Sequence, residues 1–157
     1  MLLPWFEPEI TPRVASSRVE RFDLDPHDGP GNVRAIVEAQ QMAMALHSAW
    51  MGVQVKTIYA TGGASANRAI LQVMADVFGA DVYQFVVSNT ACLGAALRAF
   101  HADAIASGNP VEWDEVVRGF AEPIASSVVR ADAQAHARYG ELISLYAQRE
   151  QDALART

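Results

Sequence analysis

The central part of the chain combines two different spacings of its apolar residues. Residues 57–60 form a short run of β-prone residues, and Gly62-Gly63 follows it. The next segment has the three- and four-residue spacing of a helix, with apolar residues at Ile70, Leu71, Val73, Met74 and Val77. Residues 81–86 have the character of a second strand. The pattern predicts a strand, a glycine turn, a helix over 66–78 and a second strand, which together form a βαβ crossover.

Patterns before and inside this unit predict further elements. Residues 19–23 alternate apolar and charged side chains, which indicates a short strand. Residues 33–50 are compatible with a largely buried helix whose N-cap is Asn32. Gly52 is expected to end this helix and Gly79 the helix that follows, because glycine adopts the left-handed C-cap conformation without strain.

The two ends of the chain differ in character. Residues 1–18 contain three prolines and no periodicity, which predicts a surface loop. The second half predicts three helices, over residues 91–106, 113–120 and 131–156, of which the last is long and amphipathic.

We therefore expect an α/β fold in a single domain over residues 1–157. Its small sheet is expected to contain the strands over 19–23, 57–61 and 81–86, covered by the helices over 33–50, 66–78 and 91–106.

Composition and charge exclude several classes of partner. The net charge is −6 and the pI is about 5.1, so no basic surface is available to displace the counterions of a nucleic acid. No apolar run approaches the length that spans a bilayer, and the N-terminus lacks the features of a signal peptide. These properties predict a cytoplasmic protein that binds neither nucleic acid nor membrane.

Two side chains with reactive groups have simple structural interpretations. The single cysteine, Cys92, lies in an apolar run and is interpreted as a small buried residue. His47 has no carboxylate or cysteine near it in the sequence, so it is interpreted as a packed or surface histidine.

The turn at Gly62-Gly63 is the strongest candidate for a binding site. Two glycines remove side chains that would keep a ligand away from the backbone. A helix that starts near Ser65 would direct unpaired N–H groups and a partial positive charge towards the same place, which suits a phosphate or the polar part of a nucleotide. The alternative is that the glycines only make a tight turn. Neither the dinucleotide-binding nor the P-loop motif is present.

Several motifs in the same order resemble the C-terminal domain of the FGGY carbohydrate kinases, and most closely the eukaryotic type of xylulose kinase. The resemblance extends over about residues 5–105. The matching motifs are Glu9-Ile10-Thr11-Pro12, Arg34-Ala35 with Glu38 and Gln40, Ala60-Thr61-Gly62-Gly63-Ala64-Ser65-Ala66-Asn67, residues 70–78, Val82-Tyr83, Ala91-Cys92 with Gly94, and Arg98-Ala99-Phe100-His101.

The resemblance implies part of an actin-like, ribonuclease-H-like ATPase domain. It implies that ATP binds against this domain and that Mg²⁺ assists the transfer of a phosphoryl group to a sugar. By the family pattern, Gly63 and Asn67 contact the adenosine part of ATP, and Gly62 and Ala64 shape the same loop. The sugar is expected to bind mostly through an N-terminal domain that this chain lacks. The Asp-x-Gly phosphate loop, the aspartate base and the Mg²⁺ ligands are likewise expected outside the chain.

Two hypotheses about function follow. In the first, the chain is the adenosine-binding side of an ATP-dependent ketose kinase and is inactive by itself, because phosphoryl transfer depends on groups that it lacks. In the second, it is a non-catalytic module for nucleotide binding or oligomerisation. An exposed sheet edge and apolar surface predict a homo-oligomer in either case.

Overall fold

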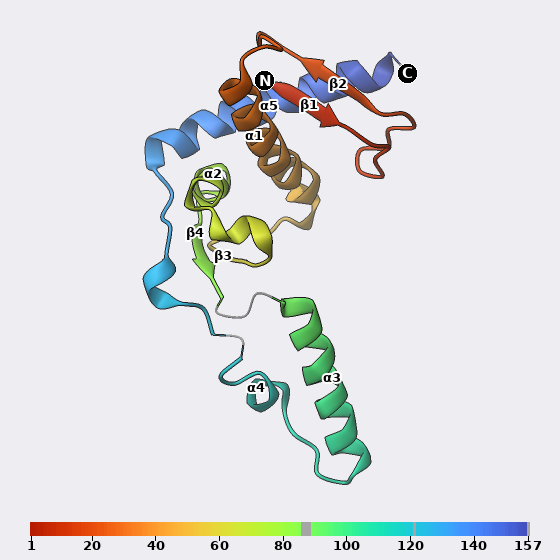
Figure 1. Ribbon diagram of the computed structural model, residues 1–157, viewed down its shortest axis with the longest axis vertical. Coiled ribbons are helices and arrows are strands. Elements are labelled where there is room, and N and C mark those ends of the chain that lie inside the picture. Colours follow the sequence, from red (N-terminus) through yellow and green to blue (C-terminus); the bar gives the residue numbers. More distant parts are fainter. Residues whose placement is uncertain (86–88, 121, 157) are drawn as a thin grey trace.

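The computed structural model describes residues 1–85, 89–120 and 122–156 and forms an elongated molecule (Figure 1). The strands are β1 Leu2–Trp5, β2 Arg18–Arg21, β3 Thr57–Ala60 and β4 Asp81–Gln84. The helices are α1 Gly29–Ser48, α2 Arg68–Phe78, α3 Thr90–Ala106, α4 Trp113–Val116 and α5 Ala133–Ala155. Three short 3₁₀ segments are η1 Ala49–Met51, η2 Gly63–Ala66 and η3 Ala125–Ser127.

The βαβ crossover is confirmed. β3 and β4 pair in parallel, with Thr57 opposite Asp81 and Ala60 opposite Gln84, and α2 connects them. Gly79 ends α2 in the left-handed conformation, with φ of 62°. Phe85 continues past β4 only as an isolated bridge to Pro123, and residue 86, the expected end of this strand, lies outside the described residues.

The expected single sheet is wrong, because β2 belongs to a second sheet. β2 pairs antiparallel with β1, within the segment expected to be a loop. Leu2, Leu3 and Trp5 are buried there, so the burial of their side chains stabilises a strand that is only four residues long. Pro4 is compatible with this strand because the sheet has only two strands and a proline is tolerated at an edge.

The helix expected over 33–50 begins earlier, and its N-cap is Asp28 rather than Asn32. The Asp28 carboxylate accepts a hydrogen bond of 3.0 Å from the Gly31 N–H, and Pro30 occupies the first turn. Asn32 instead donates its amide to the carbonyl oxygens of Asp25 and Asp28. After α1 ends at Ser48, η1 leads to Gly52, whose φ of 63° stops the helical path as expected.

The helix α2 separates two apolar clusters. Val73 and Val77 face a cluster formed with β1, α1 and α5, whereas Leu71 and Ala75 face Ala60 of β3 and Val82 of β4. The helix is therefore held from both sides, which fixes the position of its N-terminus and of the glycine turn before it.

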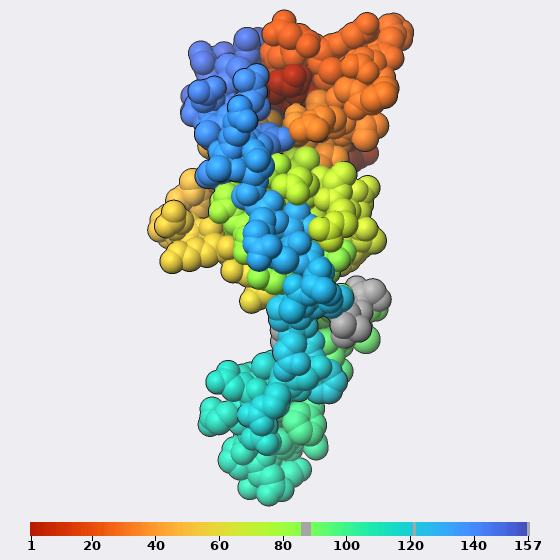
Figure 2. Space-filling view, turned by 90° about the vertical axis from the view of Figure 1, so that its left-hand side faces the viewer, coloured from red at the N-terminus to blue at the C-terminus, as the bar shows by residue number. Residues whose placement is uncertain are grey.

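In the second half of the chain, most helices lie near their expected positions in the sequence, but the way they pack differs from the expectation. α3 and α5 lie close to their expected ranges, but only the first four residues of the helix expected over 113–120 are helical. α3 and α4 project away from the rest of the molecule (Figures 1 and 2). Ala104 is the only buried residue of α3, so the interpretation of Cys92 as buried is wrong: its side chain is exposed.

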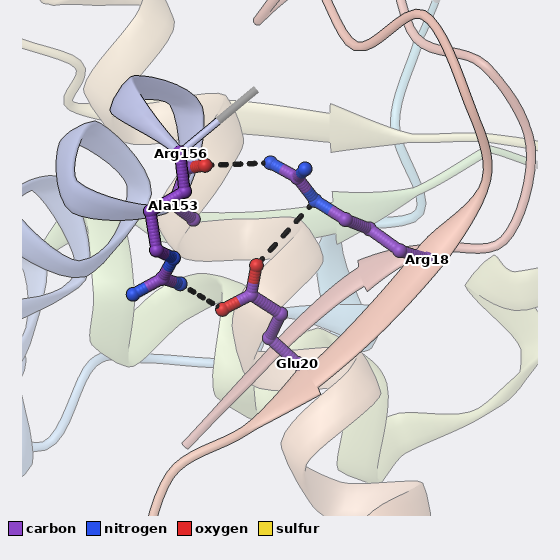
Figure 3. A network of polar contacts seen from close by, with 4 residues as sticks. All are labelled: Arg18, Glu20, Ala153 and Arg156. Atoms are coloured by element: carbon purple, nitrogen blue, oxygen red, sulfur yellow. Dashed lines mark hydrogen bonds and ion pairs between the residues drawn. The ribbon is translucent and has the colours of Figure 1, made fainter.

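Contacts with α5 close the other end of the molecule. Arg18 of β2 donates a hydrogen bond of 2.8 Å to the carbonyl oxygen of Ala153, and its guanidinium lies over the ring of Trp5. Glu20 forms ion pairs with Arg18 and with Arg156, as Figure 3 shows. This network joins the β1–β2 hairpin to the end of α5.

Candidate functional site

The two glycines of the turn have different conformations. Gly62 has φ of 83°, a region that favours glycine, and it comes directly before η2. Gly63 does not have a positive φ, and a Cβ atom added to it would meet no other atom within 4 Å. Gly62 is therefore required by the backbone, whereas the space next to Gly63 is open and any ligand there would meet the bare backbone.

Hydrogen bonds hold the turn in place. The backbone N–H and the hydroxyl of Ser65 donate to the carbonyl oxygen of Gly62, at 3.2 and 2.7 Å. The Gln84 side chain, at the end of β4, donates to the carbonyl oxygen of Ser65. Thr90, at the start of α3, donates to the hydroxyl of Thr61 at 3.2 Å. The turn is thus fixed to both neighbouring elements.

Asn67 is the N-cap of α2. Its Oδ1 accepts hydrogen bonds from the N–H groups of Ala69 and Ile70, at 2.9 and 3.4 Å. The expectation of a helix that starts near Ser65 with its N–H groups free is therefore wrong: α2 starts at Arg68, and this side chain already occupies two of its N–H groups. The turn is less suited to a phosphate than the sequence suggested. The Nδ2 group of Asn67 makes no hydrogen bond with the described part of the chain.

A cavity of about 570 Å³ lies between the first turns of α1 and α2. It is mostly apolar and is lined by Pro30, Val33, Arg34, Val37, Asn67, Ala69, Ile70 and Val73. Ala64 lines a separate and smaller cavity of about 250 Å³ beside β3. The four candidate residues therefore lie on one turn, but only Asn67 borders the larger cavity, and neither cavity is lined by Gly62 or Gly63.

Arg34 lines the larger cavity and forms a polar network with two residues outside its lining, Glu38 and Tyr139. Nε of Arg34 lies 2.7 Å from Oε1 of Glu38, and the Tyr139 hydroxyl of α5 donates to the same oxygen at 2.8 Å. Glu38, through a hydrogen bond and its charge, raises the pKa of Arg34 above its usual value. Burial, followed by the hydrogen bond to Glu38, raises the pKa of Tyr139 to about 12.

Sequence reasoning missed this network as a part of the site. Arg34 and Glu38 are four residues apart, which signals a helical ion pair, and both belong to the motif that carries the family resemblance. Tyr139 follows more than one hundred residues later, and no local pattern connects it with them.

Within residues 1–85, 89–120 and 122–156, no three His, Cys, Asp or Glu side chains lie together in a group that could hold a metal ion. None of the helices in these ranges combines the length and apolar character needed to cross a bilayer.

Known proteins resemble this chain over most of its length. The sequence is 39% identical to the xylulose kinase of Rattus norvegicus over 154 residues, which cover 94% of this chain and 28% of the rat protein. It is 32% identical to D-xylulose kinase A of Aspergillus niger over an alignment of 176 residues, gaps included, which covers 94% of this chain and 30% of that protein. The chain thus spans less than a third of the length of these relatives.

Solved structures show the same fold. A ligand-bound xylulose kinase from Lactobacillus acidophilus matches 99% of this chain and 31% of its own, with a TM-score of 0.74 and 23% identity. A xylulose kinase from Rhodospirillum rubrum matches 88% of this chain and 27% of its own, with a TM-score of 0.65 and 24% identity. These matches confirm the expected α/β class and the actin-like ATPase architecture.

A sequence profile supplies the family. It describes the C-terminal domain of the FGGY family of carbohydrate kinases, and it matches residues 2–102. This range contains both sheets, the glycine turn, Asn67 and the helices α1 and α2. The chain therefore belongs to the FGGY family of carbohydrate kinases.

Proposed function

We propose that this chain contributes the adenosine-binding side of an ATP-dependent carbohydrate kinase that acts on xylulose or a similar ketose. The observation that carries the proposal is the turn from Gly62 to Asn67, which has open space at Gly63 and a large apolar cavity beside Asn67. The rat and Aspergillus niger relatives, each of which matches 94% of the chain, are named as xylulose kinases, which supports the choice of reaction and sugar.

The residues of this chain bind and orient the nucleotide rather than move protons. An adenine base would occupy the apolar cavity between α1 and α2, and the free amide group of Asn67 would donate to it. The bare backbone at Gly63 would lie against the ribose. Mg²⁺ would neutralise charge on the phosphates. Transfer also needs a base and a phosphate loop, so we expect no sugar-dependent ADP release from this chain alone.

A pair of variants at Asn67 tests the base contact. Asn67→Asp keeps the oxygen that caps α2 but removes the Nδ2 donor, whereas Asn67→Ala removes both. We expect adenosine binding, followed by NMR titration of the chain, to weaken about five- to tenfold in both variants, as for one lost hydrogen bond. Only Asn67→Ala is expected to lose stability, by about 1 kcal/mol. Unchanged adenosine binding in Asn67→Asp would remove this contact from the proposal.

The same titration tests the turn. Gly63→Val places a branched side chain in the open space and is expected to abolish adenosine binding without unfolding the chain. Gly94→Val is the matched control, because its Cβ also meets no atom within 4 Å but it lies on α3. Equal adenosine binding by the two variants would show that the glycines only make a turn.

The alternative function is a non-catalytic module that binds nucleotide weakly or serves in oligomerisation. It is supported by the apolar surface on α3 and α4. Both functions fit a cytoplasmic homo-oligomer, which we propose on the basis of the acidic composition and this exposed surface.

A further inference from the structure

Arg34 is held in place although it is exposed. Its side chain retains 67% of its accessible surface, yet its Nε is bound to Glu38 at 2.7 Å and its Nη2 lies 3.5 Å from the Tyr139 hydroxyl. Tyr139 itself is 5% exposed and packs in the main apolar cluster. One edge of the guanidinium is therefore held by two elements, while most of the side chain remains accessible to a ligand.

This fixed group stands at the wall of the cavity between α1 and α2. The other lining residues are apolar except Asn67, so Arg34 is the only charged side chain among them. A planar guanidinium binds the face of an aromatic ring well, because it is weakly hydrated and combines stacking with attraction to the π-system. A purine base is a flat aromatic ligand with the size and polarity that this cavity suits.

We propose that Arg34 supplies the face on which the adenine base stacks, and that Glu38 and Tyr139 are positioning residues that hold this face in the cavity wall. The inference rests on the proposed function. It adds α5, which lies outside the residues matched by the family profile, to the elements that shape the nucleotide site.

An ordinary surface ion pair does not account for this arrangement. Glu38 and Arg34 four residues apart on one helix would need no third partner. Here a buried phenol from another helix donates to the same carboxylate oxygen at 2.8 Å. That second donor restricts the carboxylate and, through it, the guanidinium, which lowers the entropy lost when a base stacks on it.

Two substitutions at Arg34 separate stacking from charge. Arg34→Lys keeps the positive charge but removes the plane, and Arg34→Met removes both while keeping an apolar stem. The probes are adenosine and inorganic tripolyphosphate, titrated into the full 157-residue chain and followed by NMR. We expect both variants to bind adenosine about five- to tenfold more weakly than the unmodified chain, and Arg34→Lys to bind tripolyphosphate as the unmodified chain does, because it keeps the charge. Full adenosine binding in Arg34→Lys would overturn stacking in favour of charge attraction.

A double-mutant cycle tests the positioning role. Tyr139→Phe removes only the hydroxyl and is expected to weaken adenosine binding about two- to threefold, but to have no further effect when Arg34→Met is already present. An equal effect in both backgrounds would show that Tyr139 acts only through general packing. Thermal melting of each variant verifies the fold, and Glu38→Gln gives a second variant should Tyr139→Phe unfold.

The outcomes also separate this inference from the proposed function. If the unmodified chain binds adenosine and Asn67→Asp weakens it, but Arg34→Met does not, the nucleotide site stands and the role of Arg34 is refuted. If the folded, unmodified chain shows no adenosine binding at millimolar concentrations, both are refuted.

Discussion

Nε2 of His47, on α1, lies 3.0 Å from Oε1 of Glu150, on α5. The Glu150 residue is only 4% exposed, so its carboxylate is buried between the two helices, whereas the imidazole is partly exposed. Tyr139 and Glu38 join the same two helices nearer the start of α5. Two polar contacts thus fix how α5 lies along α1, and they set its position beside the candidate site.

Removal of His47 should leave the buried carboxylate without its partner. We expect His47→Leu to lower the free energy of unfolding by about 1–3 kcal/mol, since an unsatisfied buried acceptor retains its desolvation penalty. The double variant His47→Leu with Glu150→Leu should recover most of this loss, because no buried polar group remains. Urea denaturation of the three proteins measures both effects. If the free energy of unfolding of His47→Leu is within about 0.5 kcal/mol of that of the unmodified protein, as for an ordinary surface substitution, the contact contributes little to stability.

Local patterns in the sequence predicted what depends on near neighbours. The βαβ crossover follows from spacing and two glycines, and Gly79 ended α2 where expected. The partners of His47 and Arg34 did not follow, because Glu150 and Tyr139 are more than one hundred residues away in the sequence. The sheet partner of β2 was also missed: the burial of Leu2 and Leu3, a tertiary effect, outweighs the local signal of the nearby prolines.

The shape of the candidate turn was predictable from the sequence only in part. Gly62-Gly63 and Asn67 lie on one turn as the pattern indicated, yet the N–H groups expected to be free are capped by Asn67 itself. Capping by a side chain depends on where the helix starts, and a shift of two or three residues is beyond what spacing can resolve. The cavity beside Asn67 arises from the packing of α1 on α2, which no local pattern encodes.

Gly79 offers a test of the junction between α2 and β4. Its φ is 62°, and an added Cβ would lie 2.6 Å from Nε2 of His136 on α5. We therefore expect Gly79→Ala to destabilise the protein by about 1–3 kcal/mol, from backbone strain and from displacement of His136. Gly140→Ala is the control, since Gly140 lies within α5 with open space at its Cβ, and should stabilise by about 0.5–1 kcal/mol. Thermal unfolding measures both, and equal shifts in Tm would contradict the role of conformation at Gly79.

Tyr139 should make the stability depend on alkaline pH. Its pKa in the folded protein is about 12, compared with an ordinary value of 10.0. Below pH 10 the phenol is neutral in both states, whereas between about 10 and 12 only the unfolded state releases the proton, so stability should fall across this window. We expect Tyr139→Phe to reduce that slope in urea denaturation measured at several pH values. An unchanged slope would show that the phenol titrates alike in both states.

The exposed surface of the molecule is large for its mass. It amounts to 10115 Å², whereas a compact monomer of 17.0 kDa is expected to expose about 7,700 Å². The arm of α3 and α4 projects from the rest of the molecule in Figures 1 and 2 and contributes to this exposed surface. A groove of about 520 Å³ between these helices is lined mainly by apolar residues: Leu93, Ala96, Leu97, Phe100, Val111, Val116 and Phe120 together with Glu115.

We expect the isolated chain to dimerise through this groove, because a second copy would remove apolar side chains such as Phe100 from water. Phe100→Asp places a charge in the groove and should give a monomer, while the exposed position of Phe100 keeps the cost in stability small. Ile10→Asp is the matched control: Ile10 is 91% exposed but lies between β1 and β2, so this variant should remain a dimer. Sedimentation velocity over a range of concentrations distinguishes the species. A monomer for the unmodified chain at the highest concentration would rule out self-association. A dimer that persists in Phe100→Asp would place the interface outside this groove.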